Sequence, residues 1–302
     1  MIAEPATRPR RPLPSRTVRG AAKGLLRGYG MLTSGLRPLP DFVIIGAKRG
    51  GTTSLYNYLL AHPSVLRLFP AAQKIKGVHF FEKEFRRGVS WYRSHFPTAV
   101  RRRLATRSGG GGVVAGEASP YYLFHPHAPA RAARFIPRAR LIVLLRNPVD
   151  RAYSHYRDRV RHGVETLSFE EAIDREPERL QREIDRMQRD EWYPSFAHEH
   201  FSYVTQGEYA GPLRRWLSLF PAQRVTILLS EDFYRDPDAV YQEILAFLGL
   251  PRFLLQDFPA YNFHPRTPEM DPSTRERLLR HFAPHNRDLA DFLGRDLRGW
   301  DA

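Results

Sequence analysis

Residues 41–55 read DFVIIGAKRGGTTSL and predict a buried strand, a glycine-rich turn and the start of a helix. The apolar run from Phe42 to Ile45 is typical of a parallel strand that is buried on both faces. Gly46, Gly50 and Gly51 allow the backbone to approach an anion closely. The hydroxyl residues that follow stand at a helix N-terminus, where free amides and the helix dipole favour negative charge. The stretch therefore predicts a phosphate-binding loop.

The loop differs from that of nucleotide triphosphatases at one position. Those loops have the form Gly-x-x-x-x-Gly-Lys-[Ser/Thr], in which the lysine reaches the terminal phosphates and the hydroxyl holds Mg²⁺. Gly46 and Gly51 have this spacing, but Thr52 stands at the lysine position, and the cations Lys48 and Arg49 lie inside the loop. We expect the loop to bind a phosphate without metal-bound γ-phosphate chemistry. A P-loop kinase or nucleotide hydrolase, which would need that lysine, is the alternative enzyme class.

The composition indicates an anionic partner. The 302 residues carry a net charge of +15, which suits a nucleotide, an acidic glycan, nucleic acid or a lipid surface. The cations are spread along the chain without interleaved aromatic patches, so we expect no nucleic-acid partner, although a nucleic-acid or membrane-binding protein is the alternative from another class. The chain has no cysteine and no apolar run near the roughly 18–20 residues that cross a bilayer. We expect a cytoplasmic protein, soluble or membrane-peripheral.

The sequence divides into a basic arm, residues 1–39, and one domain, residues 40–302. Residues 19–36 are weakly amphipathic, which fits either a helix that lies on the domain or contact with anionic lipid. Alternation of strands and helices in the domain predicts an α/β, P-loop-like, three-layer fold, with a parallel sheet of about five strands flanked by helices. The expected strands are 42–45, 113–116, 140–145 and 225–229, and the main expected helices are 54–60, 149–161, 168–190 with a break at Pro177, 213–219, 239–248 and 273–281.

A second segment, residues 141–156, carries candidate ligand-binding residues. Arg146 follows a buried strand directly, at the sheet edge where open α/β folds bind ligands. Ser154 comes eight residues later, about two helical turns, so its hydroxyl can face the same ligand. Together with the loop at residues 46–54, this pair predicts a ligand with phosphates at both ends.

Several segments resemble the sulfotransferases that use 3′-phosphoadenosine 5′-phosphosulfate (PAPS), and the likeness extends in order over residues 40–300. The closest branch is the bacterial and heparan-sulfate type. The resemblance implies in-line transfer of a sulfuryl group, without a metal, from PAPS to a hydroxyl, less readily an amine, of a carbohydrate-containing acceptor. That acceptor would be a glycan, a glycolipid or a glycosylated metabolite. The segments that carry the resemblance are GAKRGGTTSL, LIVLLRNPVDRAYSHY, SFEEAI, GEYAGPLRRWLSLFP, SEDFYRDP, AFLGLP and MDPSTRERLLRHFAPHNRDLADFLGRDL.

The resemblance also implies roles for individual residues. The loop would hold the 5′-phosphosulfate, and its two cations would neutralise the oxygen that leaves. Arg146 and Ser154 match the residues that hold the 3′-phosphate, Tyr209 would lie by the nucleotide, and Arg266 is the one cation in the region of the family's late phosphate loop. The donor-binding residues of the first loop are Lys48, Arg49, Gly50, Gly51, Thr52, Thr53 and Ser54.

The general base is where this chain departs from the family pattern. Relatives commonly read Lys-Glu-x-His-Phe-Phe, with the glutamate as the base, whereas this chain reads KGVHFF and has Gly77 there. We expect His79 to take the proton and to contact the acceptor, because an imidazole titrates near neutral pH. Glu82, Glu84 and Glu117 are the alternatives, and Glu117 lies in a segment that resembles the acceptor-binding part of the family. A catalytically degenerate binding protein with the same fold also fits the loss of the usual base.

Overall fold

The computed structural model describes residues 16–109, 112–259, 261 and 269–301. Its centre is a five-stranded sheet in the order β2-β3-β1-β4-β5, in which every pair of neighbours is parallel. This confirms the predicted α/β fold with a parallel sheet. The strands are β1 (Phe42–Gly46), β2 (Val65–Leu66), β3 (Val114–Ala118), β4 (Arg140–Leu145) and β5 (Val225–Leu229). Strand β2 was not predicted, since two residues are too few to form an apolar pattern.

The helices match most of the predicted ones, with one extension and one subdivision. Helix α14 continues through Pro284, well beyond the predicted end at residue 281. The charged stretch 168–190, predicted with a break at Pro177, is three short helices. The first break falls just before Pro177, which lies in the first turn of the second helix, and a further break precedes the third. The helices are α1 (Arg16–Leu32), α2 (Thr52–Leu59), α3 (Gly88–Arg93), α4 (Ala99–Gly109), α5 (Ala128–Phe135), α6 (Pro148–Arg161), α7 (Phe169–Asp174), α8 (Glu176–Leu180), α9 (Glu183–Arg189), α10 (Phe196–His200), α11 (Ala210–Leu217), α12 (Ser230–Arg235), α13 (Pro237–Phe247) and α14 (Pro272–Leu293).

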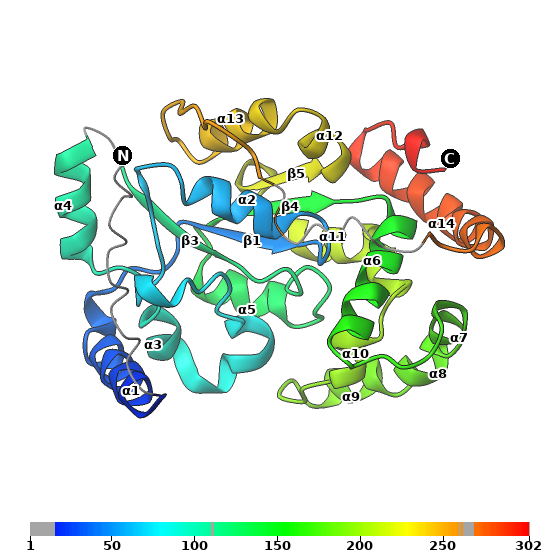
Figure 1. Cartoon of the computed structure of the whole chain (residues 1–302), viewed down its shortest axis with the longest axis horizontal. Coiled ribbons are helices and arrows are strands. Elements are labelled where there is room, and N and C mark those ends of the chain that lie inside the picture. The colour runs from blue at the N-terminus through cyan, green and yellow to red at the C-terminus, as the bar shows by residue number, and fades with distance from the viewer. Residues whose placement is uncertain (1–15, 110–111, 260, 262–268, 302) are drawn as a thin grey trace, which may run out of the picture.

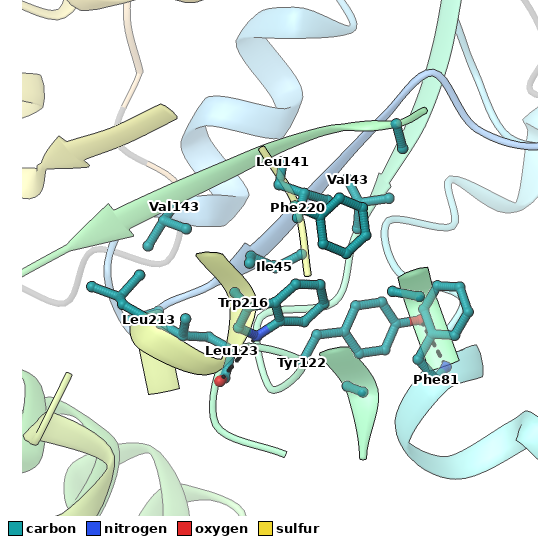
Figure 2. Packing of buried hydrophobic residues seen from close by; sticks show 14 of the residues in the cluster. Val43, Ile45, Phe81, Tyr122, Leu123, Leu141, Val143, Leu213, Trp216 and Phe220 are labelled. Atoms are coloured by element: carbon teal, nitrogen blue, oxygen red, sulfur yellow. Dashed lines mark hydrogen bonds between the residues drawn. The ribbon is translucent and has the colours of Figure 1, made fainter. Parts of the chain in front are cut away.

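Both faces of the sheet are covered, because successive side chains of a strand point to opposite faces. On one face Phe42 and Ile44 pack in a cluster with residues of α2 and α13. On the other face Val43 and Ile45 pack against Trp216 of α11 and neighbouring aromatic rings, as Figure 2 shows. Figure 1 shows α12 and α13 on one side of the sheet and α3 and α5 on the other. The result is the predicted three-layer arrangement.

A smaller apolar cluster joins α6 to α7 and α14. Val149 and Ala152 of α6 pack there with Phe169 of α7 and Phe282 of α14. Figure 1 shows α6 beside the arrowhead of β1, at the end of the sheet where the glycine-rich loop lies, with α7–α10 at the end of α6 that is away from the sheet. This cluster therefore fixes α6, which carries Ser154, beside the candidate site.

The end of the N-terminal arm packs on the domain. Arg37 is buried, and its guanidinium donates a hydrogen bond to the Phe96 carbonyl, while Arg93 donates to the Arg37 carbonyl at 2.7 Å. The ring of Tyr29 lies 5.8 Å from that of Phe69, centroid to centroid. Within the part of the chain that the structure describes, no helix has both the length and the apolar character needed to cross a bilayer.

Candidate anion-binding site

The glycine-rich loop packs closely against the carboxyl end of β4. The Ala47 amide donates to the Leu144 carbonyl at 2.7 Å, and a Cβ on Gly50 would stand only 2.4 Å from the same oxygen. Gly51, the N-cap of α2, has φ 92°, a left-handed conformation that glycine adopts without strain. Ser230 holds the loop from the far side, because its hydroxyl donates to the Gly50 carbonyl at 2.7 Å. Sheet packing thus leaves little freedom to this backbone.

The structure brings together the three residues predicted from separate segments. The Arg49 guanidinium donates from Nε to Ser154 Oγ at 3.1 Å. Arg146 donates to the Arg49 carbonyl at 3.4 Å, a long hydrogen bond. Sequence reasoning missed Asp158, whose Oδ1 accepts from Arg49 at 3.0 Å. Burial disfavours the Asp158 charge, but hydrogen bonding by Arg159 and the surrounding cations outweigh it and lower the pKa of Asp158.

Lys48, the other loop cation, contacts a different element. Its Nζ donates to the Glu199 carbonyl of α10 at 3.1 Å, lies 3.8 Å from a Glu199 carboxylate oxygen and sits 5.7 Å from the Tyr121 ring centroid. Burial lowers the pKa of Lys48 to about 8 even though Glu199 favours its charge. The two loop cations, predicted to act on the same leaving oxygen, therefore have separate partners on α6 and α10.

Lys76 is a cation of the site that sequence reasoning did not assign. Its Nζ donates to Thr53 Oγ1 at 2.8 Å and to Thr52 Oγ1 at 3.3 Å, at the N-terminus of α2. Burial, followed by repulsion from Arg49, lowers the pKa of Lys76 to about 8. Among the described residues, no carboxylate forms an ion pair with Lys76. The signal available in the sequence was its place in the KGVHFF motif, directly before the missing base.

Two residues that were predicted to bind the sulfuryl donor have side-chain hydrogen bonds to other parts of the protein. Ser54 is buried, and its Oγ accepts from the Tyr261 amide at 3.2 Å. Tyr209 is also buried, and its hydroxyl donates to the Arg146 carbonyl at 2.8 Å, so it anchors the backbone of Arg146. The prediction for Arg266 falls outside the described residues.

His79 and Glu82 form a pair at the position of the predicted base. His79 Nδ1 is hydrogen-bonded to Glu82 Oε1, and the His79 side chain is 43% exposed while that of Glu82 is fully buried. Burial opposes protonation of the imidazole, but the hydrogen bond and negative charge of Glu82 outweigh it and raise the pKa of His79. The other Glu82 oxygen, Oε2, is buried and has no partner among the described residues. The second imidazole nitrogen, Nε2, is left for another ligand.

The neighbourhood of Gly77 is closed to a side chain. A Cβ there would stand 2.6 Å from the Ala118 carbonyl oxygen, 2.8 Å from Ser119 Oγ and 3.1 Å from His79 Nε2. The space that the usual glutamate side chain would enter at position 77 is thus occupied by neighbouring atoms in this chain. His79 Nε2 lies beside the point where that side chain would begin.

The carboxylate alternatives to His79 have other partners. Glu117 is fully buried and accepts hydrogen bonds from the Val78 amide at 2.6 Å and from the Ser119 and Tyr92 hydroxyls at 2.7 and 2.8 Å. Burial raises the pKa of Glu117. This geometry gives Glu117 a structural role beneath the site and corrects the expectation that it contacts an acceptor. Glu84 pairs with Arg87 at the surface.

The fold and this cluster of partly buried cations define an α/β protein with a candidate anion site at the carboxyl edge of its parallel sheet. The family model of the sulfotransferase domain matches residues 39–257. This chain belongs to the sulfotransferase family.

Known proteins of the family are similar over most of this chain. A sulfotransferase from Alicyclobacillus acidocaldarius is 31% identical in sequence, and the structural match has a TM-score of 0.63 and covers 88% of this chain and 100% of that one. Human bifunctional heparan sulfate N-deacetylase/N-sulfotransferase 3 is 30% identical over 291 residues, 87% of this chain and 31% of that protein. Mouse heparan sulfate glucosamine 3-O-sulfotransferase 3A1 is 28% identical, over 90% of this chain and 67% of that protein. The chain thus spans about a third of the N-deacetylase/N-sulfotransferases that it matches.

Substituting Gly77 tests how tightly this region is packed. We expect Gly77→Ala to lower the free energy of unfolding by about 1–3 kcal/mol, because the new methyl group must displace the Ala118 carbonyl. Urea denaturation measures the change. Gly112→Ala is the matched control, since a Cβ at Gly112 meets nothing within 4 Å. Equal stability of the two variants would contradict this description of the packing.

Proposed function

We propose that this protein transfers a sulfuryl group from PAPS to a hydroxyl of a carbohydrate-containing acceptor. The observation that carries the proposal is Lys76, a partly buried ammonium that contacts two hydroxyls and has no carboxylate partner among the described residues. Burying an uncompensated charge is costly, so this position favours an anion at the N-terminus of α2. Family membership supports sulfate chemistry at such a site.

The chain has cationic groups for both ends of a doubly anionic donor. Lys76 and the amides at the start of α2 would hold one end, and Arg146 with Ser154 would hold the other. PAPS, when bound, supplies the activated sulfuryl group and a phosphate as its leaving group. The charge of that leaving group would be neutralised by side chains of the chain itself, so the proposal needs no metal.

His79 would act as the general base in this reaction. Glu82 would accept a hydrogen bond from the Nδ1–H group and so hold the imidazole in the tautomer whose Nε2 can take a proton from an acceptor. The carboxylate also stabilises the imidazolium that proton transfer would create. The partial exposure of His79 lets an acceptor reach it, whereas the buried Glu82 and Glu117 are shielded.

The acceptor class rests on the relatives. Several of them are named as heparan sulfate sulfotransferases, some acting on nitrogen and some on the 3-oxygen of glucosamine. From these relatives we infer for this protein only that the acceptor contains carbohydrate, and we propose that a hydroxyl oxygen is sulfated in preference to an amine nitrogen. The glycan, glycolipid or glycosylated metabolite concerned would be identified by mass-spectrometric screening for the gain of one sulfuryl group.

Binding of adenosine 3′,5′-bisphosphate tests the donor site. We expect the protein to bind this product analogue in preference to ATP with Mg²⁺, and Lys76→Met to weaken the binding about tenfold or more through loss of a charged hydrogen bond. Because the pKa of Lys76 in the free protein is about 8, its charge is present at lower pH and lost as the pH rises through that value. Affinity measured by isothermal titration calorimetry should therefore fall as the pH rises above about 8.

Lys74→Met is the matched control, since Lys74 is an exposed lysine two residues away. It should leave affinity nearly unchanged. Lys76→Arg should lose less affinity at alkaline pH than the unmodified protein, because arginine stays charged while Lys48 still loses its proton near pH 8. Preference for ATP would refute the proposed donor. Equal affinities of the Lys74→Met and Lys76→Met variants would refute the role of Lys76.

The pH dependence of turnover tests the base. We expect kcat/KM to fall as the pH drops through the pKa of His79, because only the neutral imidazole accepts a proton. The pKa of His79 is raised by Glu82, so Glu82→Gln should shift this acid limb to lower pH. His79→Ala should reduce turnover by about 10²–10⁴-fold while sparing adenosine 3′,5′-bisphosphate binding. The assay follows sulfuryl transfer from PAPS to the acceptor found by screening.

His162→Ala provides the comparison, since His162 is a surface imidazole that contacts Asp158 rather than Glu82. The acid limb of the kcat/KM profile of His162→Ala should match that of the unmodified protein. Near-normal turnover of His79→Ala would show that His79 is not the base and that a carboxylate takes the proton instead. An acid limb that stays in place in Glu82→Gln would show that the pair does not control the titration.

We also propose that α1 attaches this protein to anionic membranes from the cytoplasmic side. The helix contains four cations and no acid. Leu25 and Leu32, seven residues apart and so on one helix face, are 77% and 89% exposed, and Leu36 beyond the helix end is 64% exposed. Exposed leucines among cations suit insertion at the interface of an anionic bilayer.

Vesicles of phosphatidylcholine with and without phosphatidylserine test this attachment. The protein should co-sediment with the anionic vesicles, and the double variant Leu25→Ser/Leu32→Ser should lose most of the bound fraction. Leu254→Ser is the matched control, because Leu254 is 74% exposed but lies far along the chain from α1. Equal binding of the double variant would exclude α1 as the anchor.

A further inference from the structure

Two histidines of α14 and one glutamate from another segment form a cluster that the sulfuryl-transfer proposal does not use. His281 and His285 are four residues apart on α14, so they lie on the same face of the helix. Glu208 directly follows the short 3₁₀ turn Thr205–Gly207. One ligand atom from each of the three residues falls within 4.8 Å of those from the other two.

We propose that Glu208, His281 and His285 bind a divalent transition-metal ion of the kind that Zn²⁺ represents. Glu208 Oε1 lies 3.1 Å from His281 Nε2 and 3.7 Å from His285 Nε2. In a tetrahedral zinc site with bonds near 2.0–2.1 Å, neighbouring ligand atoms stand about 3.3 Å apart. The two glutamate–histidine separations bracket that value, and the ligand atoms of the two histidines lie within 4.8 Å of each other.

The donor set decides the chemical class of the ion. Two imidazoles and one carboxylate suit zinc and its neighbours in the first transition row, whereas Mg²⁺ and Ca²⁺ prefer sites made of oxygen ligands alone. The side chains of Glu208, His281 and His285 are 33%, 42% and 40% exposed, so an ion can enter and water can complete its coordination. The site lies on a helix, which orients its two imidazoles before the ion arrives.

An ion here would clamp α14 to the segment that supports the donor site. A Cβ on Gly207 would stand 2.9 Å from the ring of Phe282 and 2.9 Å from Pro148, so the two segments are already in close contact. Tyr209, the residue after Glu208, holds the Arg146 carbonyl. The ion would add a cross-link beside this contact and stabilise the segment around Tyr209, which holds the backbone of Arg146. The inference stands independently of the identity of the sulfuryl donor or acceptor.

Calorimetric titration of the dialysed, tag-free protein with ZnCl₂ tests the site. We expect one saturable site per chain in the unmodified protein. Glu208→Gln, His281→Ala and His285→Ala should each weaken Zn²⁺ binding at least about tenfold, as loss of a ligand does. Zn²⁺ should also raise the melting temperature of the unmodified protein but not that of the three variants, because an ion bound only to the folded state stabilises it.

Asp288→Asn is the matched control. Asp288 is a carboxylate on the same helix, but it pairs with Arg214 and lies outside the cluster. Unchanged zinc binding in Asp288→Asn, together with the three losses, would assign the ion to the cluster rather than to local negative charge. Absence of saturable binding up to millimolar Zn²⁺, or equal binding in all four variants, would overturn the proposal and leave the cluster as an ion pair.

Discussion

The hydrogen bond from the Ala47 amide to the Leu144 carbonyl, 2.7 Å long, joins the end of β1 to the end of β4, and the candidate site depends on it. It places the glycine-rich loop directly against the strand that leads to Arg146. Gly50 lies so close to the same carbonyl that a side chain there would collide with it. Parallel pairing of the two strands therefore sets both the shape of the loop and the cation that stands beside it.

The cations of this site are partly buried, and they differ in the counter-charges that they have. Arg49 has Asp158 as its counter-charge, and Lys48 has Glu199. Lys76 has only two threonine hydroxyls among the described residues. The lowered pKa values of Lys48 and Lys76, about 8 for both, express the cost of holding ammonium groups away from water. A bound anion would offset that cost most effectively beside Lys76.

The accuracy of prediction from sequence differs between the backbone and the side chains. Strands β1, β4 and β5 are predominantly apolar segments of five or six residues, and each was predicted from that pattern. Helix α14 was predicted too short, because packing of its inner face carries it through Pro284, which would otherwise weaken a helix. Arg146 was predicted from its place after a strand. Asp158 was not, because its partner Arg49 is 109 residues away.

The sequence by itself determined the glycine-rich strand-to-helix loop, the α/β alternation and the absence of a glutamate at position 77. These are local properties, since they follow from apolar runs, glycines and the order of residue types. Only the tertiary structure decided that Gly77 is closed to a side chain, that Glu82 pairs with His79 and that no carboxylate of the described residues forms an ion pair with Lys76. Steric closure, desolvation and charge pairing depend on atoms from distant segments, and folding alone brings those atoms together.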